Sequence, residues 1–177
     1  MQPATILSLL ALVGSGLCDW PAPGTVAHDS LNPVVDTLGP NGSVIKKFLP
    51  LLHIAHGSDG KVVGGHRHDW ETSIVWFDSA SVNSAIITGG ACSGHGKFKL
   101  TSSPQINSNN VKVEYYTQGG LDHELQFTNT VGRTYWIWDW DAMEPIVKGA
   151  LNKGDFKKAN CPFNDNHFET NMRAAYV

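Results

Sequence analysis

The sequence of 177 residues lacks any apolar run as long as the roughly 18 residues that a membrane-spanning helix needs. It also lacks an excess of basic charge, because 13 Lys and Arg are set against 16 Asp and Glu. Phosphate contacts need a cationic surface, so the composition argues against a nucleic-acid-binding protein. A polybasic membrane tether is equally unsupported. The length fits one domain.

Cysteine is scarce, and the three members are Cys18, Cys92 and Cys161. No CxxC pair is present, so a zinc site built from thiolates is disfavoured. A disulfide between Cys92 and Cys161 and two separate buried thiols both stay open, because sequence does not show whether the side chains meet.

The N-terminal residues differ in composition from the rest of the chain. Residues 6–13, ILSLLALV, form a short leucine-rich core, and the small residues 14–16 follow it. This pattern predicts a secretory signal over residues 1–18 and a mature domain over residues 19–177, with a buried N-terminal helix as the alternative. We therefore expect a secreted, extracellular protein.

Strands predominate in the middle of the chain. Apolar, β-branched or alternating runs predict them at residues 48–55, 72–77, 84–88, 111–117, 124–129 and 134–138. A helix is then expected from a cap at Asp141, with Glu144 closing a capping box and Gly154 ending it. Asn164 or Asp165 is expected to cap a last helix. Strands followed by two helices predict an α+β domain built on a sheet or sandwich.

The densest polar cluster is residues 64–71, GGHRHDWE, which runs directly into the predicted strand after it. In an extended chain, Asp69 and Glu71 point to one face, and His66 and His68 point to the other. A bend at the glycines would let His66, Asp69 and Glu71 converge. Such a group can hold a cation: oxygen ligands favour Ca²⁺ or Mg²⁺, and a histidine-dominated set favours Zn²⁺.

Two other readings of this cluster stay open. In the first, the residues form a solvated loop in which Arg67 pairs with Asp69 or Glu71. In the second, the cluster serves a metal-dependent hydrolase, which would need an open coordination site and an activated water. The sequence shows neither HxHxDH nor HExxH, so these two hydrolytic patterns are unsupported.

The heptapeptide Gly65–Glu71, GHRHDWE, resembles the signature of the necrosis- and ethylene-inducing-peptide-like family of secreted microbial cytolysins. Shorter segments also resemble this family, in the same order along the chain. They are residues 28–29 (HD), 48–57 (FLPLLHIAHG), 93–98 (SGHGKF), 121–128 (LDHELQFT), 140–143 (WDAM) and 159–163 (ANCPF). The resemblance covers essentially the whole of the expected mature chain.

This resemblance implies a single-domain β-sandwich flanked by helices, similar to actinoporins and fungal lectins. It implies a non-enzymatic toxin of plant pathogens, a virulence effector that causes necrosis. The expected partner is the sugar head of plant plasma-membrane sphingolipids, bound by a monomer that touches the membrane peripherally. A secreted lectin-like binder that recognises a glycan without lysis is the alternative.

The resemblance also assigns site residues. It implies a shell of His66, Asp69 and Glu71 around a divalent cation, Ca²⁺ or Mg²⁺. The other residues carried over from the family would shape the loop or line the sugar site: Arg67, His68, Asp122 and His123.

The chain departs from the family pattern near residues 57–65. Typical members have there a cysteine pair and an aromatic strand ending in Pro-Lys-Asp, whose Asp completes the cation shell. The chain is therefore expected to lack a central strand, which would leave neighbouring backbone groups unpaired. An omitted exon, a decaying paralogue and a variant that closes its sheet differently all fit this departure, so the cytolysin could be weakened or inactive.

Tryptophan is frequent, and Trp136, Trp138 and Trp140 alternate along the chain. In a strand they would share one face, which would be a sugar platform or, more commonly, part of the core. Trp70 and Trp76 are also expected in the core.

Overall fold

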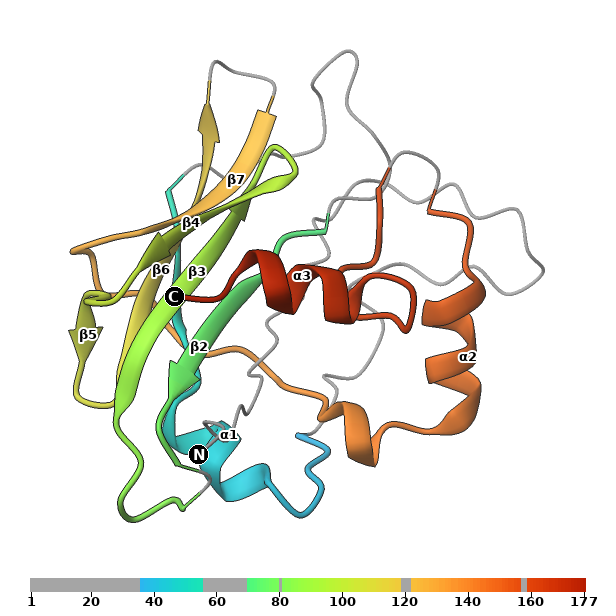
Figure 1. Cartoon of the computed structure of the whole chain (residues 1–177), viewed down its shortest axis with the longest axis horizontal. Coiled ribbons are helices and arrows are strands. Elements are labelled where there is room, and N and C mark those ends of the chain that lie inside the picture. Colours follow the sequence, from blue (N-terminus) through green and yellow to red (C-terminus); the bar gives the residue numbers. More distant parts are fainter. Residues whose placement is uncertain (1–35, 56–69, 80, 119–121, 157–158) are drawn as a thin grey trace.

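Two β-sheets and three α-helices make up the part of the chain that the structure describes (Figure 1). This computed structural model describes residues 36–55, 70–79, 81–118, 122–156 and 159–177. The predicted signal over residues 1–18 and the region near residues 57–65, where we expect the chain to be shortened, both lie outside these ranges. In the described ranges, no helix is long and apolar enough to cross a membrane.

The first sheet is organised around its longest strand, β6. Its members are β1 (Leu51–Ile54), β5 (Ile106–Asn107), β6 (Asn110–Gln118) and β7 (Asp122–Phe127). Strand β6 pairs parallel with β1 and antiparallel with β5 and β7. Val111, Val113 and Tyr115 alternate along β6 and are all buried, so one face of this sheet faces the core.

The second sheet is antiparallel, in the order β2–β3–β4. It consists of β2 (Ser73–Phe77), β3 (Ile87–Gly94) and β4 (Lys97–Thr101). His95 and Gly96 connect β3 to β4 with φ angles of 50° and 71°. Two consecutive positive φ angles are what a tight two-residue hairpin requires.

The main core lies between the two sheets and is closed at one end by α1 (Gly42–Lys47). Val75 and Phe77 of β2 point into this core, and Phe77 stacks on Phe48 at 4.9 Å between ring centroids. Ile74 and Trp76 point to the other side, where α3 (Phe168–Ala174) covers them. Every residue of β2 is buried because both faces of the strand are covered.

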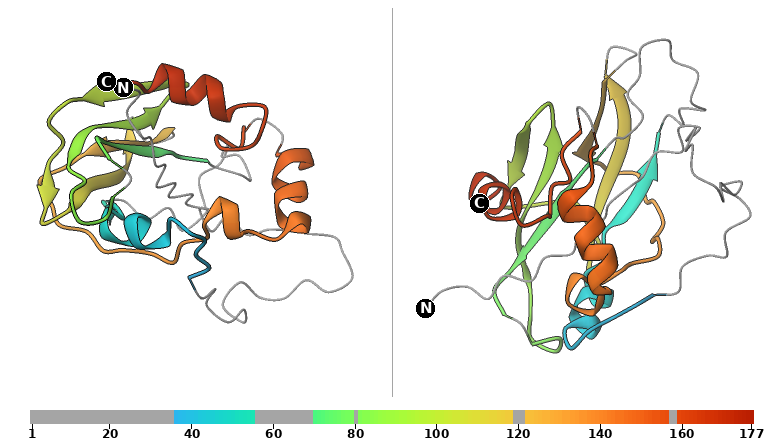
Figure 2. Two further views of the ribbon diagram at one scale, coloured as in Figure 1. Left: turned by 60° about the horizontal axis from the view of Figure 1, so that its bottom comes forward. Right: turned by 90° about the vertical axis from the view of Figure 1, so that its right-hand side faces the viewer.

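The two C-terminal helices occupy different positions (Figure 2). Helix α3 crosses the outer face of the β2–β3–β4 sheet, and α2 (Pro145–Lys153) stands at the side of the molecule. Trp76 Nε1 donates a hydrogen bond of 2.9 Å to the Ala175 carbonyl, which fixes the end of α3. Gly154 ends α2 as the sequence predicts.

The α+β class is confirmed: two sheets enclose the main core, and α3 covers the outer face of one of them. Strands follow the predictions near residues 72–77, 111–117 and 124–129, and the strand expected over residues 84–88 begins only at Ile87. Helix α1 and strand β4 were not predicted.

The strand predicted over residues 134–138 is wrong. The structure has only a bridge between Thr37 and Trp138 there. The Ile137 amide donates its hydrogen bond to the Asp36 carboxylate. A side chain thus takes the hydrogen bond that a backbone carbonyl of a neighbouring strand would accept.

The expected helix cap at Asp141 is also wrong. Asp139 caps a 3₁₀ turn (Trp140–Ala142) by accepting from the Asp141 amide, and Glu144 is the N-cap residue of α2. The cap expected at Asn164 or Asp165 is wrong too, because His167 is the N-cap residue of α3. The Asn164 side chain accepts from the His167 amide in the turn before the helix.

Cys92 and Cys161 are both buried and unpaired, so they are separate thiols and do not form a disulfide. Burial raises the pKa of both thiols, which keeps them protonated and unreactive.

Candidate functional site

The structure describes only part of the predicted site. His66, Arg67, His68 and Asp69 lie outside the described residues. The site can be followed at Glu71 and, on the first sheet, along β7, which begins at Asp122; the Asp122 side chain is likewise not described.

Glu71 lies two residues before β2, and the residue is only 7% exposed. Ser93 on β3 donates a short hydrogen bond from its hydroxyl to Glu71 Oε2. The same hydroxyl accepts from the Thr72 amide at 2.7 Å, and the Ser93 amide donates to the Thr72 carbonyl at 2.8 Å. Pairing of β2 with β3 therefore fixes the Glu71 carboxylate in place.

This arrangement fits one member of a cation shell. Ligating carboxylates are commonly oriented by a further hydrogen bond, and an oxygen donor suits Ca²⁺ or Mg²⁺. No group of three or more His, Cys, Asp or Glu comes together within the described ranges. The shell of His66, Asp69 and Glu71 therefore stays a prediction.

His123 lies on β7 and stacks on Tyr115 of β6, with ring centroids 5.2 Å apart and planes 13° apart. The side chain is half-buried. A ring packed flat on an aromatic neighbour has a defined orientation. Its predicted role in sugar binding stays a prediction.

Sequence reasoning missed a second buried carboxylate, Glu124, which follows His123 and is only 2% exposed. Lys99 Nζ of β4 lies 3.0 Å from Glu124 Oε1, and Tyr116 of β6 donates a short hydrogen bond to the same oxygen. His95, at the β3–β4 turn, has its Nε2 3.8 Å from Glu124 Oε2. We call Lys99, Tyr116, Glu124 and His95 the inter-sheet cluster.

The electrostatics of the inter-sheet cluster favour charged Glu124 and Lys99. Burial pushes the pKa of Glu124 up, but hydrogen bonds from Tyr116 and Lys99 outweigh it and hold that pKa below its ordinary value. Burial likewise opposes the charge on Lys99, yet its bonds to Tyr116 and Glu124 raise its pKa. The pKa of Tyr116 is raised by burial and by the Glu124 carboxylate.

The alternation of LDHELQF could not have revealed Glu124 as a buried residue. Leu125 points into the core between the sheets, so Glu124 is expected on the opposite, exposed face of β7. Its burial is a tertiary effect, because Gly94 of β3 and Lys99 of β4 pack against its side chain.

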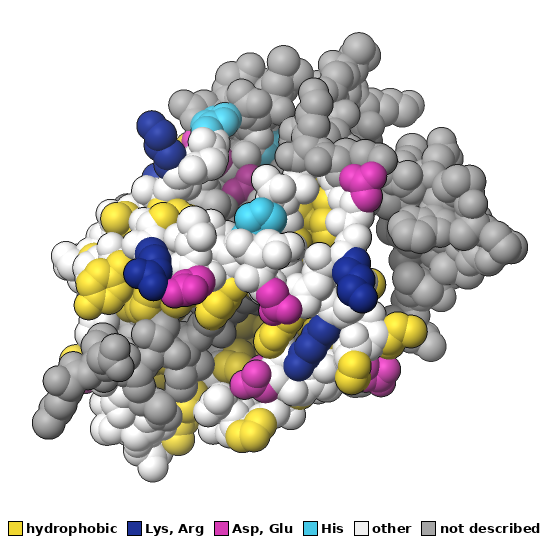
Figure 3. All heavy atoms as spheres, turned by 45° about the vertical axis from the view of Figure 1, so that its right-hand side comes forward, with side chains coloured by type: hydrophobic (Ala, Val, Ile, Leu, Met, Phe, Trp, Pro, Cys, Tyr) yellow, Lys and Arg dark blue, Asp and Glu magenta, His cyan; other side chains and the backbone are white. Residues whose placement is uncertain are grey.

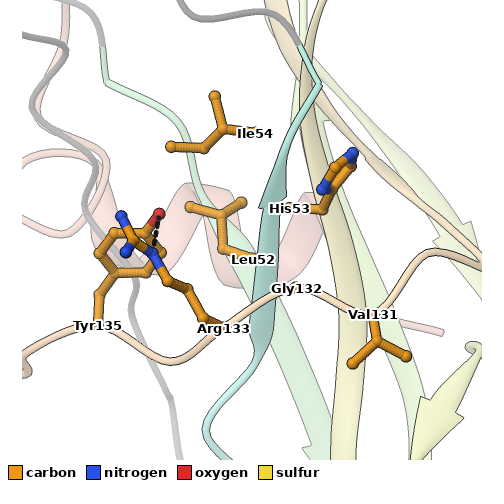
Figure 4. Close-up of a pocket in the computed structure, with 7 residues that line it drawn as sticks. All are labelled: Leu52, His53, Ile54, Val131, Gly132, Arg133 and Tyr135. Atoms are coloured by element: carbon orange, nitrogen blue, oxygen red, sulfur yellow. Dashed lines mark hydrogen bonds between the residues drawn. The ribbon is translucent and has the colours of Figure 1, made fainter.

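A groove of about 420 Å³ lies elsewhere, between β1 and residues 131–135 (Figure 4). Arg133 Nε donates to the Tyr135 hydroxyl at 3.0 Å, and the guanidinium lies over the Tyr135 ring. His53 also lines the groove, but its side chain lies on the opposite side of β1 from Arg133 and Tyr135. None of the predicted site residues lines this groove.

Two of the alternating tryptophans are on the surface. Trp136 is 61% exposed and Trp138 is 37% exposed, so the expectation of a core face is wrong for both. Trp140 is half-buried and packs edge-on against Phe163 at 5.8 Å. Trp76 is buried as predicted, and Trp70 is half-buried between Phe156 and Phe163.

Charges of both signs are interspersed over the described part of the face that Figure 3 shows. No single-sign patch dominates it, which agrees with the near balance of acidic and basic residues. This face offers no feature of a polybasic surface.

Comparison with curated proteins shows that the chain is similar to NLP effector proteins. NLP effector protein 1 of Phytophthora capsici is 38% identical over 114 residues, which cover 63% of this chain and 49% of that protein. The chain thus spans about half the length of this relative.

Comparison with solved structures gives the same fold. The structure of NLPPya in complex with glucosamine has a TM-score of 0.70 at 25% identity and covers 86% of this chain and 98% of that one. The structure of the non-toxic HaNLP3 protein has a TM-score of 0.69 at 23% identity and covers 84% and 98%. These neighbours confirm the expected toxin fold, an α+β domain with a β-sandwich.

The model of the family described as necrosis inducing protein (NPP1) matches residues 56–175, about two thirds of the chain. This match agrees with the order of the sequence motifs, with the effector relative and with the fold. The chain therefore belongs to the necrosis inducing protein (NPP1) family.

Proposed function

We propose that the chain is a secreted, non-enzymatic cytolysin that binds the sugar head of plant sphingolipids with the help of a divalent cation and damages the membrane. The observation that carries the proposal is the buried Glu71 carboxylate, which lies two residues before β2 and is held by Ser93. A buried carboxylate at the end of the heptapeptide is where the family resemblance requires a cation ligand. Membership of a necrosis-inducing family supports the lytic part of the proposal.

A sugar ligand is supported by the fold neighbour NLPPya, whose structure contains glucosamine. An amino sugar is neutral or cationic and rich in hydroxyls, so carboxylates and a fixed imidazole are suitable partners for it. In this chain Glu71 and His123 supply such groups from the two sheets. We propose that the sugar head is bound between them, with the cation on the Glu71 side.

Dye leakage from vesicles tests the proposal. Vesicles that contain plant glycosylated sphingolipids should leak when the full chain is added with Ca²⁺, and a chelator should stop the leakage. Glu71→Gln should abolish leakage while keeping the fold, because the amide oxygen can still accept from Ser93.

Glu114→Gln is the matched control, since Glu114 is a half-buried carboxylate that pairs with His53 and Gln126 on the first sheet. This control variant should leak vesicles as the unaltered chain does. Leakage that ignores both the chelator and Glu71→Gln would contradict the cation-dependent site.

A secreted, non-lytic glycan binder is the second candidate, and the likeness to the non-toxic HaNLP3 structure favours it. The same vesicles distinguish the two candidates. Binding to glycolipid vesicles in a flotation assay, without release of dye, would support the lectin-like function and contradict the cytolysin.

A further inference from the structure

Strands β3 and β7 belong to different sheets and lie against each other. Each strand carries one half of the candidate site. Ser93 of β3 holds Glu71, and β7 carries His123. The separation of the two halves therefore depends on how β3 and β7 are held together, and the inter-sheet cluster lies at that contact.

Lys99 makes its hydrogen bonds across the contact. Its ammonium lies 3.0 Å from the Tyr116 hydroxyl, 3.1 Å from the Leu125 carbonyl and 3.0 Å from Glu124 Oε1. An ammonium has three protons, so these three acceptors of the first sheet can satisfy all of them. A lysine of β4 is thus bound to β6 and β7 in one geometry.

Glu124 completes the link on the side of β3. A Cβ atom built on Gly94 would lie 2.2 Å from Glu124 Oε2 and 3.2 Å from its Cδ, so the carboxylate rests directly on the Gly94 backbone. Gly94 follows Ser93, the residue that holds Glu71. Glu124 follows His123 on β7, so its position bears on both halves of the site.

We propose that Glu124, held by Lys99 and seated on Gly94, is a positioning residue that sets the distance between the Glu71 and His123 halves of the site. The proposal rests on the proposed function, because it assigns Glu124 a role in the binding of the same cation and sugar. Glu124 acts through its neighbours and does not itself touch the ligand.

Calcium binding by folded variants is the first test. Glu124→Gln and Lys99→Met should each weaken Ca²⁺ binding by about tenfold, the lower end of the effect of outer-shell partners on metal affinity. The double variant should bind no more weakly than the worse single variant, because both changes break one interaction. Glu114→Gln should keep the affinity of the unaltered chain. Equal affinity in all four variants would overturn the proposal.

Amide hydrogen exchange provides a second test that needs no cation. The Thr72 amide donates to Ser93 Oγ beside Glu71, and neither Thr72 nor Ser93 is substituted in these variants. It should exchange faster in Glu124→Gln and Lys99→Met than in Glu114→Gln, relative to the core amide of Val75 in each variant. A purely stabilising role would speed both amides equally and would overturn the proposal.

The two tests also separate the proposals from each other. If the unaltered chain binds no Ca²⁺ and causes no leakage, the proposed function fails, and the exchange of Thr72 still decides whether Glu124 positions the Glu71 half. If Glu124→Gln does not fold, Gly94→Ala displaces the carboxylate from the other side. It should then reproduce the loss of Ca²⁺ affinity, and normal affinity in folded Gly94→Ala would contradict the proposal.

Discussion

Two contacts of the β2–β3–β4 sheet differ in their chemistry. Beside the apolar core that it shares with the first sheet, it is held to β6 and β7 by the charged and phenolic groups of the inter-sheet cluster. Against α3 and the C-terminal residues, it is held by apolar contacts, among them the edge-on pair of Trp76 and Tyr176 at 5.4 Å. The polar contact with β6 and β7 can therefore be compared with the apolar contact on the outer face of the same sheet.

We expect the apolar contact to contribute mainly to the stability of the fold and the polar contact mainly to the geometry of the site. Burial of aromatic area contributes most of the free energy of unfolding and tolerates small displacements. Buried charges contribute little net stability after desolvation, but their hydrogen bonds require particular distances. We therefore expect substitutions in the apolar contact to unfold the chain, and substitutions in the polar contact to change the site first.

The largest effect is expected at the apolar contact. Trp76→Ala removes the packing against Tyr176 and α3 and the hydrogen bond to the Ala175 carbonyl. It should lower the free energy of unfolding by about 3–5 kcal/mol, as large-to-small core substitutions do. Urea denaturation followed by tryptophan fluorescence measures the change. A loss below 1 kcal/mol would show that α3 contributes little to the fold.

A smaller effect is expected at the polar contact. Gly94→Ala places a methyl group on the Glu124 carboxylate, which must move. The free energy of unfolding should fall by about 1–3 kcal/mol, the usual cost of an added methylene in a packed site. Gly149→Ala is the matched control, because a Cβ there meets nothing within 4 Å. Equal urea midpoints for the two variants would remove the distinction between the contacts.

The pH dependence of stability should also distinguish the two contacts. The pKa of Glu124 is held below its ordinary value of 4.5, so its stabilising effect is present above pH 4.5 and is lost as the pH falls through the lower, folded-state pKa. His95, Lys99 and Tyr116 face this carboxylate. Thermal melts should be recorded between pH 6 and pH 3, which bracket the ordinary carboxyl pKa. As the pH is lowered, the melting temperature should fall less steeply for Glu124→Gln than for the unaltered chain. Parallel curves would contradict the assignment.

The smallest effect is expected where an aromatic side chain is largely exposed. Trp136 is largely exposed, so Trp136→Ser should change the free energy of unfolding by no more than about 0.5 kcal/mol. Thermal denaturation beside Trp76→Ala measures the contrast. A loss comparable to that of Trp76→Ala would mean that exposure does not separate the two tryptophans.

The spacing of apolar residues and the local composition predicted those strands whose burial depends on their own side chains. The apolar run before Asp78 gave β2, and the alternation around Val113 gave β6, because the burial of each strand follows from its own side chains. The strand predicted around Trp136 does not form, because the backbone there makes its hydrogen bonds to Asp36 and Thr37, which lie far away in the sequence.

The candidate site was predictable at Glu71 and not at Glu124. Glu71 belongs to a contiguous motif whose residue types point to cation chemistry. Glu124 looks like an outward-facing strand residue, and only the approach of Gly94 and Lys99 from another sheet buries it. Contacts between strands distant in sequence leave no local pattern to find.

The bond from Lys99 to the Leu125 carbonyl has a consequence for self-association. In the described residues β7 pairs only with β6, so it is an edge strand. An edge strand with free carbonyls can recruit a strand from another molecule, and lysines at edges hinder such recruitment. Lys99, which belongs to the neighbouring sheet, donates a hydrogen bond to one of these carbonyls, that of Leu125. Its ammonium therefore also helps to keep concentrated protein from aggregating through β7.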